Sequence, residues 1–208
     1  MSPADHDPNT TPSTATVTFL TPDGRTVVQT HTVAPQSRFS IWVDYADPAL
    51  ADTAVSTTVE VTNDVPIVVE RAMWWPSDAS RWHEAHNSPG ATSAGLAWVV
   101  SGGEDGGPTD TETYVLIANT AEIGATVRVS VLLEDGHTHA RLFSVPARSR
   151  FNVQLRAEFA AIAGQRFGVL VESIGLGTAP IVVESAIYGD ANGVPWQAGA
   201  NALATRLR

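Results

Sequence analysis

Cysteine and lysine are both missing from this chain of 208 residues. Without cysteine there are no disulfides, no thiol nucleophiles and no cysteine-ligated metals. Without lysine, the 12 basic residues are all arginine, against 22 acidic residues and a formal net charge of −10. This balance disfavours binding to nucleic acid or to an anionic membrane surface, because both need clustered basic side chains.

Long apolar runs are also absent, and no segment reaches the ~20 residues that span a bilayer, so we expect no membrane insertion. Residues 1–14 are rich in Pro, Thr, Ser and Asp, with neither a basic nor an apolar region of a signal peptide. They predict a disordered leader. G-x-S-x-G, a P-loop and a G-x-G-x-x-G turn after a strand are missing as well, and we expect no enzymatic activity.

The hydrophobic residues, 43% of the chain, occur in short Val- and Thr-rich runs separated by turn residues. Residues 16–20 and 26–33 flank Pro22-Asp23-Gly24 and predict a hairpin. This cadence is typical of an all-β sandwich, with further strands at 38–43, 55–62, 67–74 and 113–118 and short helices at 47–52 and 158–163.

Three blocks of sequence recur in the same order at a nearly constant offset. The chain is therefore predicted to form two tandem immunoglobulin-like antiparallel β-sandwich modules related by internal duplication. Module 1 is expected at 15–100, a Gly- and acid-rich linker or loop at 101–112, and module 2 at 113–208. The strand at 113–118 has no evident counterpart before residue 15, so copy one lacks its first strand or borrows one. The recurring blocks are 15–27 with 125–139, 37–39 with 149–151 and 66–70 with 180–184.

"ETYVLIANT", "ATVRVSVLLEDG", "VPARSRFNV" and "APIVVESAIY" follow one another in copy two. This series resembles a tandem β-module of large secreted and surface proteins of GC-rich bacteria, which carries no assigned activity. The resemblance covers nearly all of 15–207 and implies an all-β fold in an extracellular setting. Copy two departs from the pattern where Arg71, Trp74 and Trp75 of copy one are replaced.

Glu70 recurs as Glu184, in each copy among apolar neighbours of a strand. A buried carboxylate needs a partner, because an unpaired buried charge costs several kcal/mol or loses its ionisation. Arg38 and Arg150 are the other repeated charges, and arginine suits bidentate pairing. We therefore expect two structural ion pairs, Glu70–Arg38 and Glu184–Arg150, rather than catalytic groups.

Three tryptophans, Trp74, Trp75 and Trp82, lie close together in "WWPSDASRWHEAH". Together with Arg71 they form the candidate ligand-binding residues, since exposed aromatic rings stack on sugars and anchor protein partners. Alternation along a strand places Trp74 and Trp75 on opposite faces, Trp75 sharing its face with Arg71. Packing is the competing interpretation of these rings.

Metal sites are weakly indicated. His83 and His86 lack the four-residue spacing of zinc-binding helices, and His137 with His139 has no evident third ligand. Oxygen-rich loops suit calcium, which leaves calcium as an alternative to having no cofactor. The acidic residues that suggest a calcium site are Glu104, Asp105, Asp110 and Glu112.

The favoured function is a non-enzymatic structural, adhesive or spacer repeat of a bacterial secreted or surface protein. Its expected partners are proteins, or a second copy joined through an edge strand. A carbohydrate-binding module that uses exposed tryptophans is the alternative, so a glycan partner stays open. The expected location is extracellular or at the cell surface, the chain being a mature form or fragment.

Overall fold

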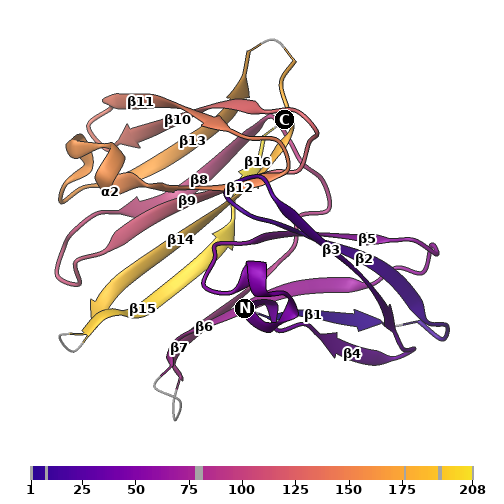
Figure 1. The fold of residues 1–208 in the computed structure, drawn as a ribbon. Coiled ribbons are helices and arrows are strands. Elements are labelled where there is room, and N and C mark those ends of the chain that lie inside the picture. Colours follow the sequence, from indigo (N-terminus) through magenta and orange to yellow (C-terminus); the bar gives the residue numbers. More distant parts are fainter. Residues whose placement is uncertain (1, 8, 78–81, 176, 192–193, 208) are drawn as a thin grey trace.

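A computed structural model describes residues 2–7, 9–77, 82–175, 177–191 and 194–207, without the side chains of 2–7, 76, 77, 82 and 83. The described chain is all-β, as predicted, with four antiparallel sheets that stack as two sandwiches. In Figure 1 the first sandwich is drawn in indigo and purple, the second in pink to yellow. No helix in the described part is long and apolar enough to cross a membrane.

The second sandwich is complete on both sides. One sheet has the order β11-β10-β13-β8-β16 and the other β12-β9-β14-β15. Their inner faces meet in a large core that includes Trp98, Ile117, Val171 and Ile181. The strands are β8 (Ala97–Glu104), β9 (Glu112–Asn119), β10 (Ala125–Leu133), β11 (Thr138–Val145), β12 (Ser149–Gln154), β13 (Arg166–Ile174), β14 (Ile181–Ala191), β15 (Val194–Leu203) and β16 (Thr205–Arg206).

The first sandwich has a much smaller core. Its sheets have the orders β3-β2-β5 and β4-β1-β6-β7. The buried cluster, with Phe19, Val43 and Leu50 among its members, contains no residue of β6 or β7. The strands are β1 (Ser2–Asp7), β2 (Ser13–Leu20), β3 (Thr26–Val33), β4 (Ser37–Ser40), β5 (Ser56–Val61), β6 (Val68–Ser77) and β7 (Trp82–Pro89).

The two sandwiches repeat one strand order. The sheet β4-β1-β6-β7 corresponds to β12-β9-β14-β15, and β3-β2-β5 corresponds to β11-β10-β13. The larger sheet of the second sandwich continues beyond β13 with β8 and β16, whereas the described part of the first has no strand beyond β5. Internal duplication and an immunoglobulin-like topology stay predictions, to which this likeness of strand order adds weight.

The hairpin turns follow from their sequence. β2 and β3 pair in register from Ser13 with Val33 to Leu20 with Thr26. In the connecting turn Gly24 has φ +80°, which glycine adopts without steric cost. The Thr21 hydroxyl donates to Asp23, and this bond, followed by one from the Arg25 backbone, lowers the Asp23 pKa to about 2.

Three features differ from the sequence-based prediction. Residues 2–7, expected in a disordered leader, form β1, which pairs with β4 and β6 just as β9 pairs with β12 and β14. The first copy therefore has its counterpart of β9. Residues 97–104, assigned to module 1 and the linker, form β8 and pair with β13 of the second sandwich. The boundary thus precedes β8.

The helices are shorter than expected and begin earlier. In the first sandwich the structure has α1 (Val43–Ala46) and a 3₁₀ turn at Pro48–Leu50. In the second it has α2 (Leu155–Glu158) and a 3₁₀ turn at Ala160–Ile162. Each pair lies between corresponding strands and buries one aliphatic residue per element, which anchors the crossing from one sheet to the other.

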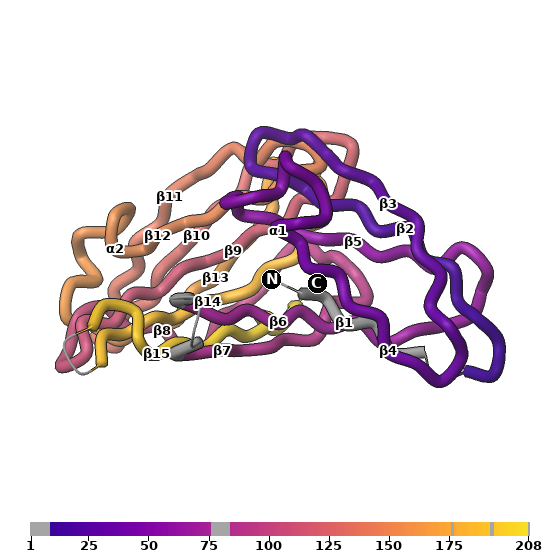
Figure 2. The backbone as a smooth tube through the Cα atoms, turned by 60° about the horizontal axis from the view of Figure 1, so that its bottom comes forward, coloured from indigo at the N-terminus to yellow at the C-terminus, as the bar shows by residue number. Residues whose placement is uncertain are grey.

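The two sandwiches lie against each other along β7 and β15. Figure 2 shows these two strands side by side at the base of the molecule, with the sheet of β2, β3 and β5 sloping above them. β7 and β15 are the edge strands of their sheets and form no ladder with each other within the described residues. Side chains therefore hold this contact together, among them the candidate residues Arg71 and Trp75.

Candidate functional site

Strand β6 presents two different faces, as the alternation of its residues predicts. Arg71 and Trp75 point toward the second sandwich, where they contact Glu184 and Tyr188. Glu70 lies on the other face beside Arg38, and Trp74 meets Trp42 there.

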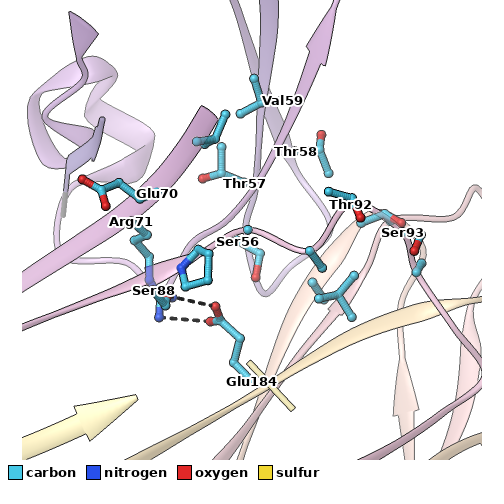
Figure 3. Close-up of a pocket in the computed structure, with 18 of the residues that line it drawn as sticks. Ser56, Thr57, Thr58, Val59, Glu70, Arg71, Ser88, Thr92, Ser93 and Glu184 are labelled. Carbon is cyan, nitrogen blue, oxygen red and sulfur yellow. Dashed lines mark hydrogen bonds and ion pairs between the residues drawn. The ribbon is translucent and has the colours of Figure 1, made fainter. Parts of the chain in front are cut away.

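The contact between Arg71 and Glu184 joins the two sandwiches. Arg71 Nη2 lies 3.0 Å from Glu184 Oε2, and the two side chains are only 16% and 19% exposed. Ser88 Oγ of β7 lies 3.3 Å from Glu184 Oε1, and Asn201 Nδ2 of β15 donates to Ser88 Oγ at 3.1 Å. Figure 3 shows Arg71 and Ser88 converging on Glu184 from one side. The carboxylate is thus held by groups from both sandwiches.

The predicted ion pairs fare differently. Arg38 Nη2 lies 4.0 Å from Glu70 Oε1, with both side chains exposed, at 63% and 41%. This contact is loose and solvated rather than buried. Glu184 forms its ion pair with Arg71 across the module boundary rather than with the predicted Arg150, on which it acts only through Coulombic attraction. The repeat points to the wrong arginine because Arg71 has no counterpart in copy two, where Ser185 takes its position.

Arg150 also reaches into the first sandwich. Its Nη1 donates to the carbonyl oxygen of Val55 at 2.7 Å, and its backbone N–H donates to Thr21 O at 3.3 Å. Its Nε donates to Asn152 within β12 at 2.8 Å. Burial, with a smaller contribution from Arg71, lowers the Arg150 pKa to about 10. The guanidinium therefore stays charged at neutral pH. Its charge strengthens the hydrogen bond to the carbonyl oxygen of Val55, the residue just before β5.

An aromatic cluster closes the other end of the contact. Trp75 meets Tyr188 edge to face at 5.3 Å between centroids, and its Nε1 donates to Trp196 O at 2.7 Å. Tyr188 stacks on Trp196 at 4.8 Å, and Tyr114 meets both rings. Gly199 makes room for this packing, since a Cβ there would lie 2.7 Å from the Trp75 ring. Trp75 is therefore a packing residue between modules.

Trp196 adopts an unfavourable backbone conformation in this cluster. Its φ of +55° is unusual for a bulky residue. Asp190 accepts from the Trp196 backbone N–H at 3.1 Å, and the Trp196 carbonyl accepts the Trp75 indole proton. The strained backbone thus gives both main-chain groups a partner, one of them on the other module.

Trp74 belongs to a second aromatic group, on the outer face of β6. Its ring meets Trp42 edge to face at 5.3 Å, and Trp42 meets Tyr45 of α1 at 5.5 Å. Tyr45 is 81% exposed and Trp42 44%. The side chain of Trp82, the third candidate tryptophan, lies outside the described residues. Trp74 thus lies in a group of rings that reaches solvent, and so does Trp75, whose cluster includes Trp196 at 41% exposed.

His86 lies against the Arg71 side of the contact. Its ring meets Trp75 at 5.2 Å, and within the described residues neither ring nitrogen has a hydrogen-bond partner. Burial, and then the nearby Arg71 charge, lower the His86 pKa below the ordinary 6.5, against a smaller opposing effect of Glu84. The neutral ring is the form that fits this site.

The acidic loop that suggested a calcium site surrounds the side chain of an arginine. Arg156 Nε lies 2.6 Å from Asp105, its Nη2 2.7 Å from Asp110 and its Nη1 3.4 Å from Glu112. The hydrogen bonds that Arg156 donates to Asp110, and then to Asp105, raise the Arg156 pKa above its ordinary value. Glu104, the fourth acidic residue, lies 3.6 Å from Arg166 instead. A guanidinium therefore stands where the sequence suggested a metal ion.

The histidine pairs form no ligand set in the described structure. His137 lies 3.0 Å from Asp135 in an exposed turn, and the His83 side chain falls outside the described residues. No group of three or more His, Asp or Glu side chains in the described part is arranged to hold a metal ion.

A cavity of about 690 Å³ lies between the first sandwich and the second. Its walls are β5, the start of β6, the segment 88–94 and the outer face of β9 and β14. In Figure 3 Ser56, Thr57 and Val59 face the space from one side, and Arg71 and Glu184 lie at its end. The lining is mainly aliphatic and hydroxyl-bearing, which suits an apolar or peptide ligand.

No protein-family model matches the chain, and no curated protein sequence is similar to it. Among solved structures, the crystal structure of Thermotoga maritima 1070 aligns with 56% of this chain and 97% of its own, at a TM-score of 0.48 and 12% identity. The Anabaena sensory rhodopsin transducer aligns with 46% of this chain and 91% of its own, at a TM-score of 0.37 and 21% identity. Likenesses this weak say nothing about what the chain does.

The two arginine–glutamate contacts of β6 form a matched pair for a stability test. We expect Arg71→Met and Glu184→Gln each to lower the free energy of unfolding by about 1–3 kcal/mol, because each leaves a largely buried polar group unpartnered. A double-mutant cycle from urea melts should give a coupling of at least ~1 kcal/mol. The exposed control pair, Arg38→Met and Glu70→Gln, should couple by less than ~0.5 kcal/mol. Equal couplings would contradict the assignment.

Removing Arg156 should convert the acidic loop into a cation site. In Arg156→Gln, Asp105, Asp110 and Glu112 lose their shared countercharge, so we expect a loss of about 1–3 kcal/mol that millimolar Ca²⁺ restores. Thermal melts with Ca²⁺ or EDTA measure this, and the wild type should not respond. Arg141→Gln, whose partner is the single carboxylate of Glu158, is the control. Calcium-dependent melting of the wild type would refute the interpretation.

His86 should make stability fall in acid. Because its pKa is lower in the folded than in the unfolded chain, the unfolded chain gains the proton first as pH drops below about 6.5. Stability is therefore full above that pH and declines below it. The pH dependence of urea melts between pH 8 and 5 should flatten in His86→Gln but not in His139→Gln, a variant at an exposed position of β11. Identical profiles for wild type and His86→Gln would exclude this role.

Proposed function

We propose that this chain is a non-enzymatic structural unit, an adhesive element or spacer of a bacterial secreted or surface protein, in which two β-sandwich modules act as one body. The contact between the modules carries the proposal. Arg71 and Trp75, the residues best suited by type to bind a ligand, are used to hold Glu184 and Tyr188. These two side chains therefore hold the modules together and are not free to bind a ligand.

The composition and the sequence resemblance support the same role. An excess of ten negative charges favours solubility and discourages self-association of exposed faces. The resemblance to tandem β-modules of secreted and surface proteins supports an extracellular location. Fractionation of producing cells tests that location directly, because a protein found only with the cytosolic fraction would contradict it.

A body held together in this way should unfold as one. We expect a single calorimetric transition for the wild type, with equal calorimetric and van't Hoff enthalpies. The variant Trp75→Ala with Glu184→Ala removes the aromatic and carboxylate parts of the contact and leaves the Arg150 bonds to Val55 and Thr21. Its two modules should therefore unfold in separate transitions, the first module at the lower temperature because its core is smaller. Trp74→Ala, on the opposite face of β6, should keep one transition. Two separated transitions in the wild type would show that the modules unfold independently, against the proposal.

Carbohydrate binding is the second candidate, and one observation favours it. Trp42, Tyr45 and Trp74 gather at the outer face of β6, and the first two are well exposed. Their rings are tilted or perpendicular to one another, which suits a curved sugar chain rather than a flat platform. A polysaccharide titration followed by tryptophan fluorescence tests it, with Trp42→Ala as the binding-deficient variant. No change across a broad glycan panel would remove this candidate.

A further inference from the structure

The edge of β5 lacks the neighbour that its counterpart in the second sandwich has. β13 is paired on one side with β10 and on the other with β8. β5 is paired with β2, and no described strand lies on its other side. β5 contains no proline, lysine or arginine, the residues that commonly protect a free edge.

The register shows which backbone groups are available on β5. Thr62 N–H donates to Thr14 O at 2.8 Å, so the even-numbered residues of this stretch bond toward β2. In an antiparallel ladder the alternate residues then point away, and these are Thr57, Val59 and Val61. The counterpart of Val61 is Ser173, whose N–H donates to Leu96 O at 2.8 Å as β8 begins.

The inner side chains of β5 are incompletely covered. Val17 pairs with Val59 in β2–β5, and Val129 pairs with Val171 in β10–β13, so Val59 occupies the position of Val171. Val171 is fully buried, whereas Val59 is half-buried. What covers Val171 is Trp98 of β8, which pairs directly with it and is 2% exposed.

The cavity lies where a strand equivalent to β8 would run. Its lining includes Thr57, Val59 and Val61 of β5, and also Ile67. The counterpart of Ile67 is Ile181, whose carbonyl accepts the Trp98 indole proton at 2.9 Å. At about 690 Å³ the space is within the range of ligand pockets, roughly 300–1,000 Å³.

We propose that the free edge of β5 binds an extended peptide segment of another protein, which adds antiparallel as a fourth strand to β3-β2-β5. The segment has the side-chain pattern of β8: a tryptophan opposite Val59, an aliphatic residue opposite Thr57, and residues no larger than valine at the alternate positions. Main-chain bonds to Thr57, Val59 and Val61 supply affinity, and the indole in the cavity supplies specificity.

A second copy of this chain is a poorer occupant than a separate peptide. The strand with the required pattern, β8, is already in the core of its own module, and freeing Trp98 would expose a fully packed ring. The segment 88–94 and the face of β9 and β14 also line the cavity, so an occupant there lies against both sandwiches. The proposed binding is independent of the spacer role, so either stands if the other fails.

The test uses the protein's own strand as the probe. A peptide of residues 95–102, "GLAWVVSG", is added to the full chain, and hydrogen exchange is followed by NMR at the amides of Thr57, Val59 and Val61. We expect exchange at these three amides to slow by about tenfold or more at saturating peptide, with little change at Thr58 and Glu60. The wild-type chain suffices, so the result does not depend on a variant folding.

Two altered peptides and one variant supply the controls. N-methylation at the Val100 position removes a ladder donor and keeps the side chain, and Trp98→Ala in the peptide removes the indole; each should weaken binding by about tenfold. Thr57→Trp should fill the cavity and abolish binding, whereas Glu60→Gln, on the outer face of β5, should not. Protection at another edge, equal affinity of all three peptides, or β5 amides already protected by a concentration-dependent dimer would each overturn the proposal.

Discussion

Burial of the Glu184 carboxylate between two sandwiches is the constraint around which the rest of the structure is arranged. On an isolated second module this side chain would stand on the outer face of β14 in water. Docking removes most of that water, so the carboxylate needs Arg71 and Ser88 from the first module. Those partners fix how β6 and β7 lie over β14 and β15, and with them the separation of the two sheets of the first sandwich.

The first sandwich is open for the same reason. In a closed sandwich the inner face of β6 would bury aliphatic side chains against β2 and β5. Here that face carries Arg71 and Trp75, which turn to the second module, and the buried cluster of the first module gains nothing from β6. Side chains of β6 that would otherwise join the core of the first module therefore form the interface instead. The cavity beside β5 lies where they do not fill the core.

The sequence predicted the all-β class, the alternation of β6 and the approximate positions of β2, β3, β4, β5, β6 and β9, because each depends on local hydrophobic period and turn chemistry. It failed for β1, since "SPADHD" has no strand pattern and is a strand because β4 and β6 pair with it on both sides. It failed for the end of β8 because glycines there suggest a linker. Gly103 is required for packing, as a Cβ would lie 2.3 Å from the Phe167 ring.

At the candidate site, the need for a charged partner could be predicted from the sequence, but the identity of that partner could not. That Glu184 needs an arginine follows from elementary electrostatics, but which arginine depends on docking between modules, and a repeat alignment directs attention within each copy. Arg150 was expected to serve Glu184 and instead binds the Val55 carbonyl of the other module. Ser88 and Asn201 carried no signal at all, because single hydroxyl and amide groups on strands are common and become informative only when a buried charge lies beside them.

The contact between the modules has a direction. The first module contributes Arg71 from the inner face of its strand, the second contributes Glu184 from the outer face of the corresponding strand, and at the position of Arg71 the second module has Ser185. A further module stacked in the same sense would find no guanidinium to receive its carboxylate. Growth by this contact beyond the second module therefore lacks its arginine, whereas the first module keeps the corresponding carboxylate, Glu70, exposed on its outer face.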